Sequence, residues 1–235
     1  MKRIILLLFL AALCVAVSDC ASIFRKKEAK ATTRDVREIL FDRQVEILLD
    51  KGYPKAAGMK KDQFLEYINP LRKQIQEIDE VKPGHIPFII VIPERFVSIS
   101  KQISLVKEKV GSHILHMGLY TSQNCSGIRT WNWPYLILDV DDGREMLEPF
   151  LKESYARWKF KQRGRSGLTM LEGIALLTYY PEILENYFLL LVGSSNAPVV
   201  RCFVPWPAPW IWYQSIGFLP TPTGAPSCSK RSFEK

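Results

Sequence analysis

The segment at residues 168–195 reads LTMLEGIALLTYYPEILENYFLLLVGSS, and every local signal in it agrees with its neighbours. Thr169 is a favourable N-cap residue, and Glu172 follows at the spacing of a capping box. Pro181 should end the resulting helix and start a short helical turn. Residues 187–192 are uniformly apolar and predict a central strand covered on both faces. The segment carries no catalytic signature, so we interpret it as scaffold.

Two helices are predicted near the N-terminus. Apolar residues recur at three- and four-residue spacing over residues 34–51 and again over residues 60–77. Pro70 lies inside the second pattern, so a break is expected near Asn69. A further helix is expected over residues 143–152, directly after an acidic turn. The buried stripe of the first helix should consist of Val36, Ile39, Leu40, Val45, Leu48 and Leu49.

Short apolar runs bounded by prolines or turn residues predict buried strands over residues 86–93 and 135–140. These elements predict an α+β fold in which the N-terminal helical pair packs with a mixed or antiparallel sheet. The capped helix should cover one face of that sheet. We expect a single domain over residues 34–231 and a tail at 232–235. The Pro-, Gly- and Ser-rich residues 219–235 should lie on the surface.

The composition is that of an ordinary globular protein, with 47% hydrophobic and 24% charged residues in a chain of 235. No internal repeat is visible, which excludes a solenoid. The net charge of +8 favours contact with anionic partners, although a basic protein without such a partner has the same balance.

The N-terminus resembles a secretory signal peptide. Met1, Lys2 and Arg3 precede an apolar run at residues 4–17, and small residues follow. We therefore assign residues 1–22 to a signal peptide and residues 23–33 to a basic linker. The run is short for a membrane span. The chain is expected to be secreted or extracytoplasmic, and the segment could instead be retained as an anchor or lipidated at Cys20.

Three cysteines lie beyond the signal segment: Cys125, Cys202 and Cys228. In an exported chain this number allows one disulfide and one thiol. Cys202 with Cys228 is the preferred pair, because both flank the Trp- and Pro-rich region and would close it into a loop. The alternative is that all three are reduced and buried.

Asp139, Asp141 and Asp142 lie at the end of the predicted strand at residues 135–140 and form the best candidate metal site. Carboxylates at the end of a strand can bind Mg²⁺ or Ca²⁺, although the full spacing of a calcium loop is missing. Helix capping is the structural alternative. With Glu172, these carboxylates would also suit a metal-assisted hydrolase. The chain has no Gly-x-Ser-x-Gly elbow and no Gly-rich phosphate loop.

Two further regions are candidate binding surfaces. In an extended chain, the alternation over residues 157–165 would place cations on one side and Trp158 and Phe160 on the other. Such a segment suits an anionic polymer or a membrane surface, and an exposed linker is the alternative. A Pro-rich run at residues 205–213 could present tryptophans to sugars, peptides or membrane, or could cover the core. The candidate residues are Arg157, Lys159, Lys161, Arg163, Arg165, Trp206, Trp210 and Trp212.

The stretches FDRQVEILLDKGYP, PFIIVIP, YLILDVDDG, LTMLEGIALLTYYPEILE and GAPSC occur in this order. Together they resemble an uncharacterised bacterial domain family of unknown function, over about residues 40–231. The pattern LT-x-x-EGIAL-x-T-x-x-PE is the most specific part. The resemblance implies one domain but no activity, cofactor or site residue, and the signal-like segment departs from members that look cytosolic. We expect an exported, non-enzymatic binding or interaction domain, with the metal-assisted hydrolase as the alternative.

Overall fold

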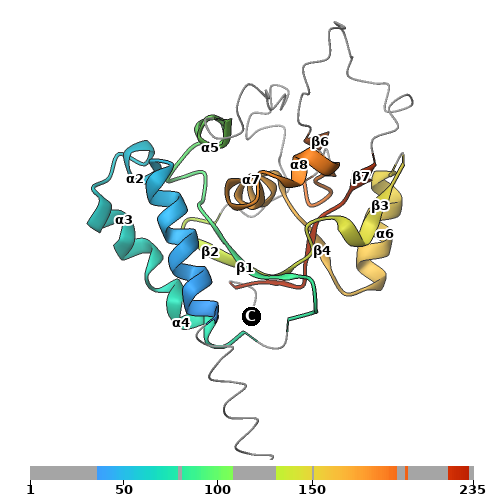
Figure 1. The fold of residues 1–235 in the computed structure, drawn as a ribbon, viewed down its shortest axis with the longest axis horizontal. Helices are drawn as coiled ribbons and strands as arrows, with labels where there is room; N and C mark the ends of the chain where they lie inside the picture. Colours follow the sequence, from blue (N-terminus) through green and yellow to red (C-terminus); the bar gives the residue numbers. More distant parts are fainter. Residues whose placement is uncertain are drawn as a thin grey trace, which may run out of the picture. The chain divides into compact units, whose positions relative to one another are not determined.

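The computed structural model describes residues 36–78, 81–107, 131–149, 151–194, 199–200 and 222–232. The chain divides into two compact units, Met1–Phe41 and Asp42–Lys235. Residues 36–50 are helical, and all the labelled elements of Figure 1 belong to the larger unit. Among the described residues, no helix has the length and apolar character required to cross a membrane.

The larger unit combines helices and short strands, which confirms the predicted α+β class. Its helical elements are α2 (Tyr53–Ala56), α3 (Lys61–Ile68), α4 (Leu71–Ile75), α5 (Ile99–Lys107), the 3-10 helix η2 (Arg144–Met146), α6 (Glu153–Gln162), α7 (Met170–Tyr179) and α8 (Ile183–Asn186). Its strands are β1 (Ile86–Val91), β2 (Tyr135–Val140), β3 (Leu147–Glu148), β4 (Ser166–Gly167), β5 (Phe188–Leu190), β6 (Val199–Val200), β7 (Thr223–Gly224), β8 (Ser227–Cys228) and β9 (Lys230–Arg231).

The strands form three small sheets, and their pairing is mixed or antiparallel, as predicted. One has the order β1-β2-β9, one has the order β3-β7-β5-β6, and the third pairs β4 with β8. All described pairings are antiparallel except that of β5 with β7. The predicted strand at residues 187–192 is shorter than expected but occupies an interior position in its sheet.

The C-terminal segment links all three sheets. Between residues 222 and 232, β7 pairs with β3 and β5, β8 pairs with β4, and β9 pairs with β2. Figure 1 shows these strands in red beside elements from the middle of the chain. The expected surface tail is therefore wrong for residues 223–228, which are buried. The small polar residues of this segment are buried because their backbone groups pair with strands of all three sheets.

The helix-forming signals before β1 are partly confirmed. The second predicted helix breaks into α3 and α4 at Asn69 and Pro70, as expected. In the first helix, however, Val36 and Ile39 are exposed, whereas Gln44 and Leu48 are buried. The Gln44 side chain donates to the Phe88 carbonyl at 2.8 Å and accepts from the Ile90 N–H at 2.9 Å. A polar residue on the buried stripe thus satisfies two backbone hydrogen-bonding groups at the edge of β1.

The predicted helix at residues 143–152 is wrong. Only the single turn η2 forms, and the backbone then becomes extended in β3. Leu147 pairs with Gly224 and Glu148 with Thr223, so hydrogen bonding to β7 replaces continuation of the helix. This pairing partner lies far along the chain and leaves no local signal.

Helix α7 begins with the predicted capping box. The Thr169 hydroxyl accepts from the Glu172 N–H at 3.2 Å, and the Thr169 N–H donates to the Glu172 carboxylate at 2.8 Å. Almost the whole helix is buried, rather than one face of it. The Tyr179 hydroxyl donates to the Ile90 carbonyl at 2.9 Å, which attaches α7 to β1. At Gly173, a Cβ would lie 2.5 Å from Leu191 side-chain carbons, so glycine allows this close packing.

Candidate functional site

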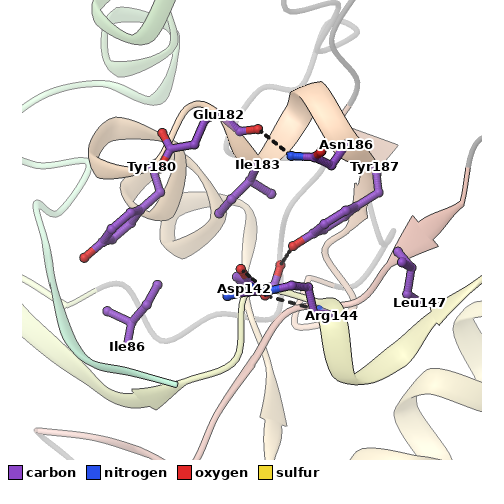
Figure 2. Close-up of a pocket in the computed structure, with 9 residues that line it drawn as sticks. All are labelled: Ile86, Asp142, Arg144, Leu147, Tyr180, Glu182, Ile183, Asn186 and Tyr187. Carbon is purple, nitrogen blue, oxygen red and sulfur yellow. Dashed lines mark hydrogen bonds and ion pairs between the residues drawn. The ribbon is translucent and has the colours of Figure 1, made fainter. Parts of the chain in front are cut away.

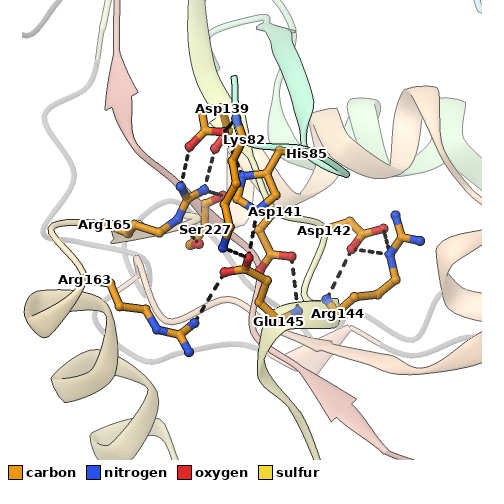
Figure 3. Close-up of polar contacts among 10 residues, drawn as sticks. All are labelled: Lys82, His85, Asp139, Asp141, Asp142, Arg144, Glu145, Arg163, Arg165 and Ser227. Atoms are coloured by element: carbon orange, nitrogen blue, oxygen red, sulfur yellow. Dashed lines mark hydrogen bonds and ion pairs between the residues drawn. The ribbon is translucent and has the colours of Figure 1, made fainter. Parts of the chain in front are cut away.

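The three aspartates at the end of β2 and directly after it have different partners (Figure 3). The Asp139 carboxylate accepts from the Arg165 guanidinium at 2.5 Å, from the Lys82 N–H at 3.1 Å and lies 2.7 Å from the His85 Nδ1. Asp141 accepts from the Glu145 N–H at 3.3 Å. The Asp142 carboxylate accepts from the backbone N–H and the Nε of Arg144 at 3.2 and 2.9 Å.

The structure does not bring Asp139, Asp141 and Asp142 together as a metal site. Among the described residues, no group of three or more His, Cys, Asp or Glu side chains could hold a metal ion. Asp141 and Asp142 instead cap a helix, the structural alternative, since both accept from backbone N–H groups at the start of η2.

Asp139 has a left-handed backbone, with φ of 48°, at the end of β2. The register places Pro87 opposite Asp139, and proline has no N–H to donate. The Arg165 guanidinium donates to the Asp139 carbonyl instead. Burial acts to raise the pKa of Asp139, but hydrogen bonds from Arg165, Lys82 and His85 lower it overall. Arg165 therefore has a structural role in the larger unit.

His85 connects two acidic groups. Its side chain is only 3% exposed, and its Nε2 lies 3.1 Å from the Glu145 carboxylate while Nδ1 faces Asp139. Glu145 also pairs with Lys82 and, at 3.4 Å, with Arg163. The hydrogen bond from Lys82 is the main cause that lowers the pKa of Glu145. These contacts join the turn before β1 to η2 and to the residues after α6.

The carboxylate of Glu172, which the hydrolase alternative requires, is also engaged in hydrogen bonds within the fold. The Arg231 guanidinium donates to both of its carboxylate oxygens, at 2.6 and 2.8 Å, and the Tyr135 hydroxyl donates at 3.3 Å. Its carboxylate additionally caps α7. Asp141 and Glu172 thus both hold helix starts, and the carboxylate-based hydrolase loses its geometric basis.

The basic segment at residues 157–165 is not an extended strand, and this expectation is corrected. Its first six residues belong to α6, which extends from Glu153 to Gln162. Ala156 and Phe160, four residues apart, are buried on the inner face, so helical spacing decides the packing. Trp158 consequently lies on the outer face and is 54% exposed.

The outer face of α6 combines aromatic rings with cations. The ring centroids of Tyr155 and Trp158 lie 6.0 Å apart at an interplanar angle of 31°. The Lys159 Nζ lies 5.9 Å from the Trp158 ring centroid, and the Lys161 side chain is exposed. Arg157 differs, because it pairs with Glu153 at 2.7 Å and donates to the Ser194 carbonyl at 2.5 Å. We call Tyr155, Trp158, Lys159 and Lys161 the α6 outer patch.

A pocket of about 540 Å³ opens between the α7–α8 turn and the ends of β1 and β2 (Figure 2). The predicted acidic cluster contributes only Asp142 to it. The remaining residues were not predicted, because they come together from five separate elements. The pocket is lined by Ile86, Asp142, Arg144, Leu147, Tyr180, Glu182, Ile183, Asn186 and Tyr187.

Residues 47–212 match a family model described as "Family of unknown function (DUF5701)". The chain belongs to this family. The matched region contains the capping box of α7, the α6 outer patch and every residue that lines the pocket. Neither the comparison with curated proteins nor the comparison with solved structures found a match.

Several predicted features of this DUF5701 member lie outside the described residues. These are the signal peptide at 1–22 and linker at 23–33, Cys202, and the tryptophans at 206, 210 and 212. The pairing of Cys202 with Cys228 therefore stays a prediction, and Cys228 itself is buried in β8.

Proposed function

We propose that this protein is exported and acts as a non-enzymatic binding domain that attaches to an anionic membrane surface through the α6 outer patch. The observation that carries the proposal is the position of Trp158. It projects from a helix whose inner face is buried, next to Tyr155 and Lys159 and on the same helix as Lys161. The apolar run at residues 4–17 and the cations of residues 23–33 support a location beside a membrane.

The residue types of the patch suit a membrane interface. Tryptophan and tyrosine favour the headgroup region, because their rings are apolar and carry one polar atom. Lysine stems cover apolar surface while their ammonium groups reach the lipid phosphates. Each lysine near an anionic membrane contributes about 1 kcal/mol, and salt weakens that contribution. Two lysines and two rings predict weak, salt-sensitive attachment that a second signal in the chain would reinforce.

Vesicle co-sedimentation tests the proposal. The chain recovered from cells is mixed with phosphatidylcholine vesicles that either contain or lack phosphatidylglycerol. We expect stronger binding to the anionic vesicles, and Trp158→Ala and Lys161→Gln should each reduce that difference. Any contribution of the N-terminal apolar run is common to all variants and to both vesicle types.

Trp133→Ala is the matched control, because Trp133 is 57% exposed but lies outside the patch. It should bind as the unmodified chain does. Equal binding to both vesicle types would contradict the proposal, as would binding of single-stranded nucleic acid in place of vesicles. For export, mass spectrometry of the mature N-terminus provides the check, and an intact Met1 in a cytosolic fraction would contradict it.

A further inference from the structure

The pocket between the α7–α8 turn and η2 is separate from the α6 outer patch and shares no residue with it. Its volume of about 540 Å³ falls in the range of small-molecule sites. Ile86, Leu147, Ile183 and the rings of Tyr180 and Tyr187 supply most of its wall (Figure 2). A mainly apolar wall with a few polar groups is the usual composition of a ligand site.

Arg144 provides a positioned cation in this wall. Its Nε donates to the Asp142 carboxylate at 2.9 Å, and its backbone N–H donates to the same group. The guanidinium is thereby held from one side, while the side chain remains 66% exposed. Within the described part of the chain, its two terminal amino groups have no partner. Two parallel N–H donors of this kind match a carboxylate or a phosphate.

The opposite end of the pocket carries the Tyr180 phenol. Its hydroxyl has no hydrogen-bond partner among the described residues, and Figure 2 shows it directed toward Ile86. Burial is the main cause that raises the pKa of Tyr180, and the nearby charge of Arg43 acts against it. The hydroxyl is therefore protonated at neutral pH and can donate to an acceptor.

The side chain of Ile183, from α8, lies between the Arg144 end and the Tyr180 end of the pocket, next to Tyr187. The Tyr187 hydroxyl donates to the Asp142 carbonyl at 3.4 Å, and this contact holds the ring in the wall of the pocket. Of the two acidic groups, Asp142 is paired with Arg144, and Glu182 is exposed to solvent, where its charge is screened.

We propose that this pocket binds a small organic anion: a carboxylate or phosphate group on the terminal amino groups of Arg144, and an apolar chain or ring against Ile183 and Ile86. The class of ligand follows from the two terminal amino groups of Arg144, which have no partner among the described residues, and from the apolar wall beside them. This site is independent of the membrane contact proposed above.

The fluorescent probe 8-anilinonaphthalene-1-sulfonate, an aromatic sulfonate, tests the site in the full chain. We expect saturable binding to one site, displaced by octanoate or octyl phosphate but not by octylammonium. Arg144→Gln should weaken binding about tenfold, because it removes a charge-assisted hydrogen-bond pair to the ligand. Ile183→Trp should fill the pocket and abolish binding.

Arg163→Gln is the matched control, since it removes the same charge from outside the pocket. This variant should bind the probe with unchanged affinity. Trp158→Ala controls for probe binding to the α6 outer patch. Displacement by octylammonium as readily as by octanoate would overturn the proposal. So would equal affinity in Arg144→Gln, or loss of binding in Trp158→Ala while Arg144→Gln still binds. A loss of fold in Ile183→Trp leaves the Arg144→Gln result decisive.

Discussion

Arg231 and Glu172 form a buried bidentate ion pair, with Nε 2.6 Å from Oε1 and Nη2 2.8 Å from Oε2. The pair connects β9, near the C-terminus, to the first turn of α7. Because the Glu172 side chain is only 1% exposed, its charge depends on this guanidinium, on the capping N–H and on the Tyr135 hydroxyl.

Arg231→Met should therefore lower the free energy of unfolding by about 3 kcal/mol or more, since it leaves a buried carboxylate without its cation. Urea unfolding followed by circular dichroism measures the change. The double variant Arg231→Met with Glu172→Gln should recover part of the loss. Arg163→Gln, at an exposed pair with Glu145, should change stability by less than about 1 kcal/mol. A loss of similar size in both arginine variants would refute the special role of Arg231.

The carboxylates of Asp139 and Glu145 predict acid sensitivity. Both have pKa values below their unfolded values of 3.8 and 4.5, so their contribution is complete above those values. It is lost as the pH falls through the lower folded pKa values. We expect the urea midpoint to decrease from about pH 5 downward, with a shallower slope in Asp139→Asn with Glu145→Gln. An unchanged slope in the double variant would contradict the assignment to this network.

Asp141 should behave in the opposite sense. Burial raises its pKa above 3.8, although hydrogen bonds from the Glu145 and Gly143 N–H groups act against this, and its Oδ2 has no partner among the described residues. The folded state therefore disfavours the charged form, and its penalty grows as the pH rises above the unfolded value. Asp141→Asn should raise the urea midpoint at pH 7 and have little effect at pH 3. Destabilisation at pH 7 would show that the carboxylate has a partner that stabilises its charge.

Gly193 should not tolerate a side chain. A Cβ there would lie 2.6 Å from both the Leu168 carbonyl carbon and the Thr169 nitrogen, and closer still to the Gly167 carbonyl. These atoms are backbone and cannot rotate away. Gly193→Ala should thus cost at least about 2 kcal/mol in thermal unfolding experiments. Gly167→Ala meets a side chain, Val192, as its nearest neighbour and should cost less. Equal effects would indicate that the β4–α7 connection can shift.

Much of the fold was accessible from local patterns. The capping box at Thr169 and Glu172, the break at Pro70 and the strands at residues 86–91 and 135–140 all depend on neighbours within a few positions. The site was less accessible. Asp142 was found from its place after a strand, but Arg144 and Tyr180 were missed, because their shared pocket arises only when α7 and α8 pack over β1 and β2.

By itself, the sequence determined the α+β class, the start of α7 and the family, because caps, breakers and apolar periodicity act over one or two turns of chain. Only the tertiary structure decided the roles of the charged residues. Asp139 and Arg165 meet across 26 positions, and Glu172 and Arg231 across 59. An ion pair requires its two charged groups within about 4 Å of each other. The local spacing of residues does not predict which distant cation the fold will place beside a given carboxylate.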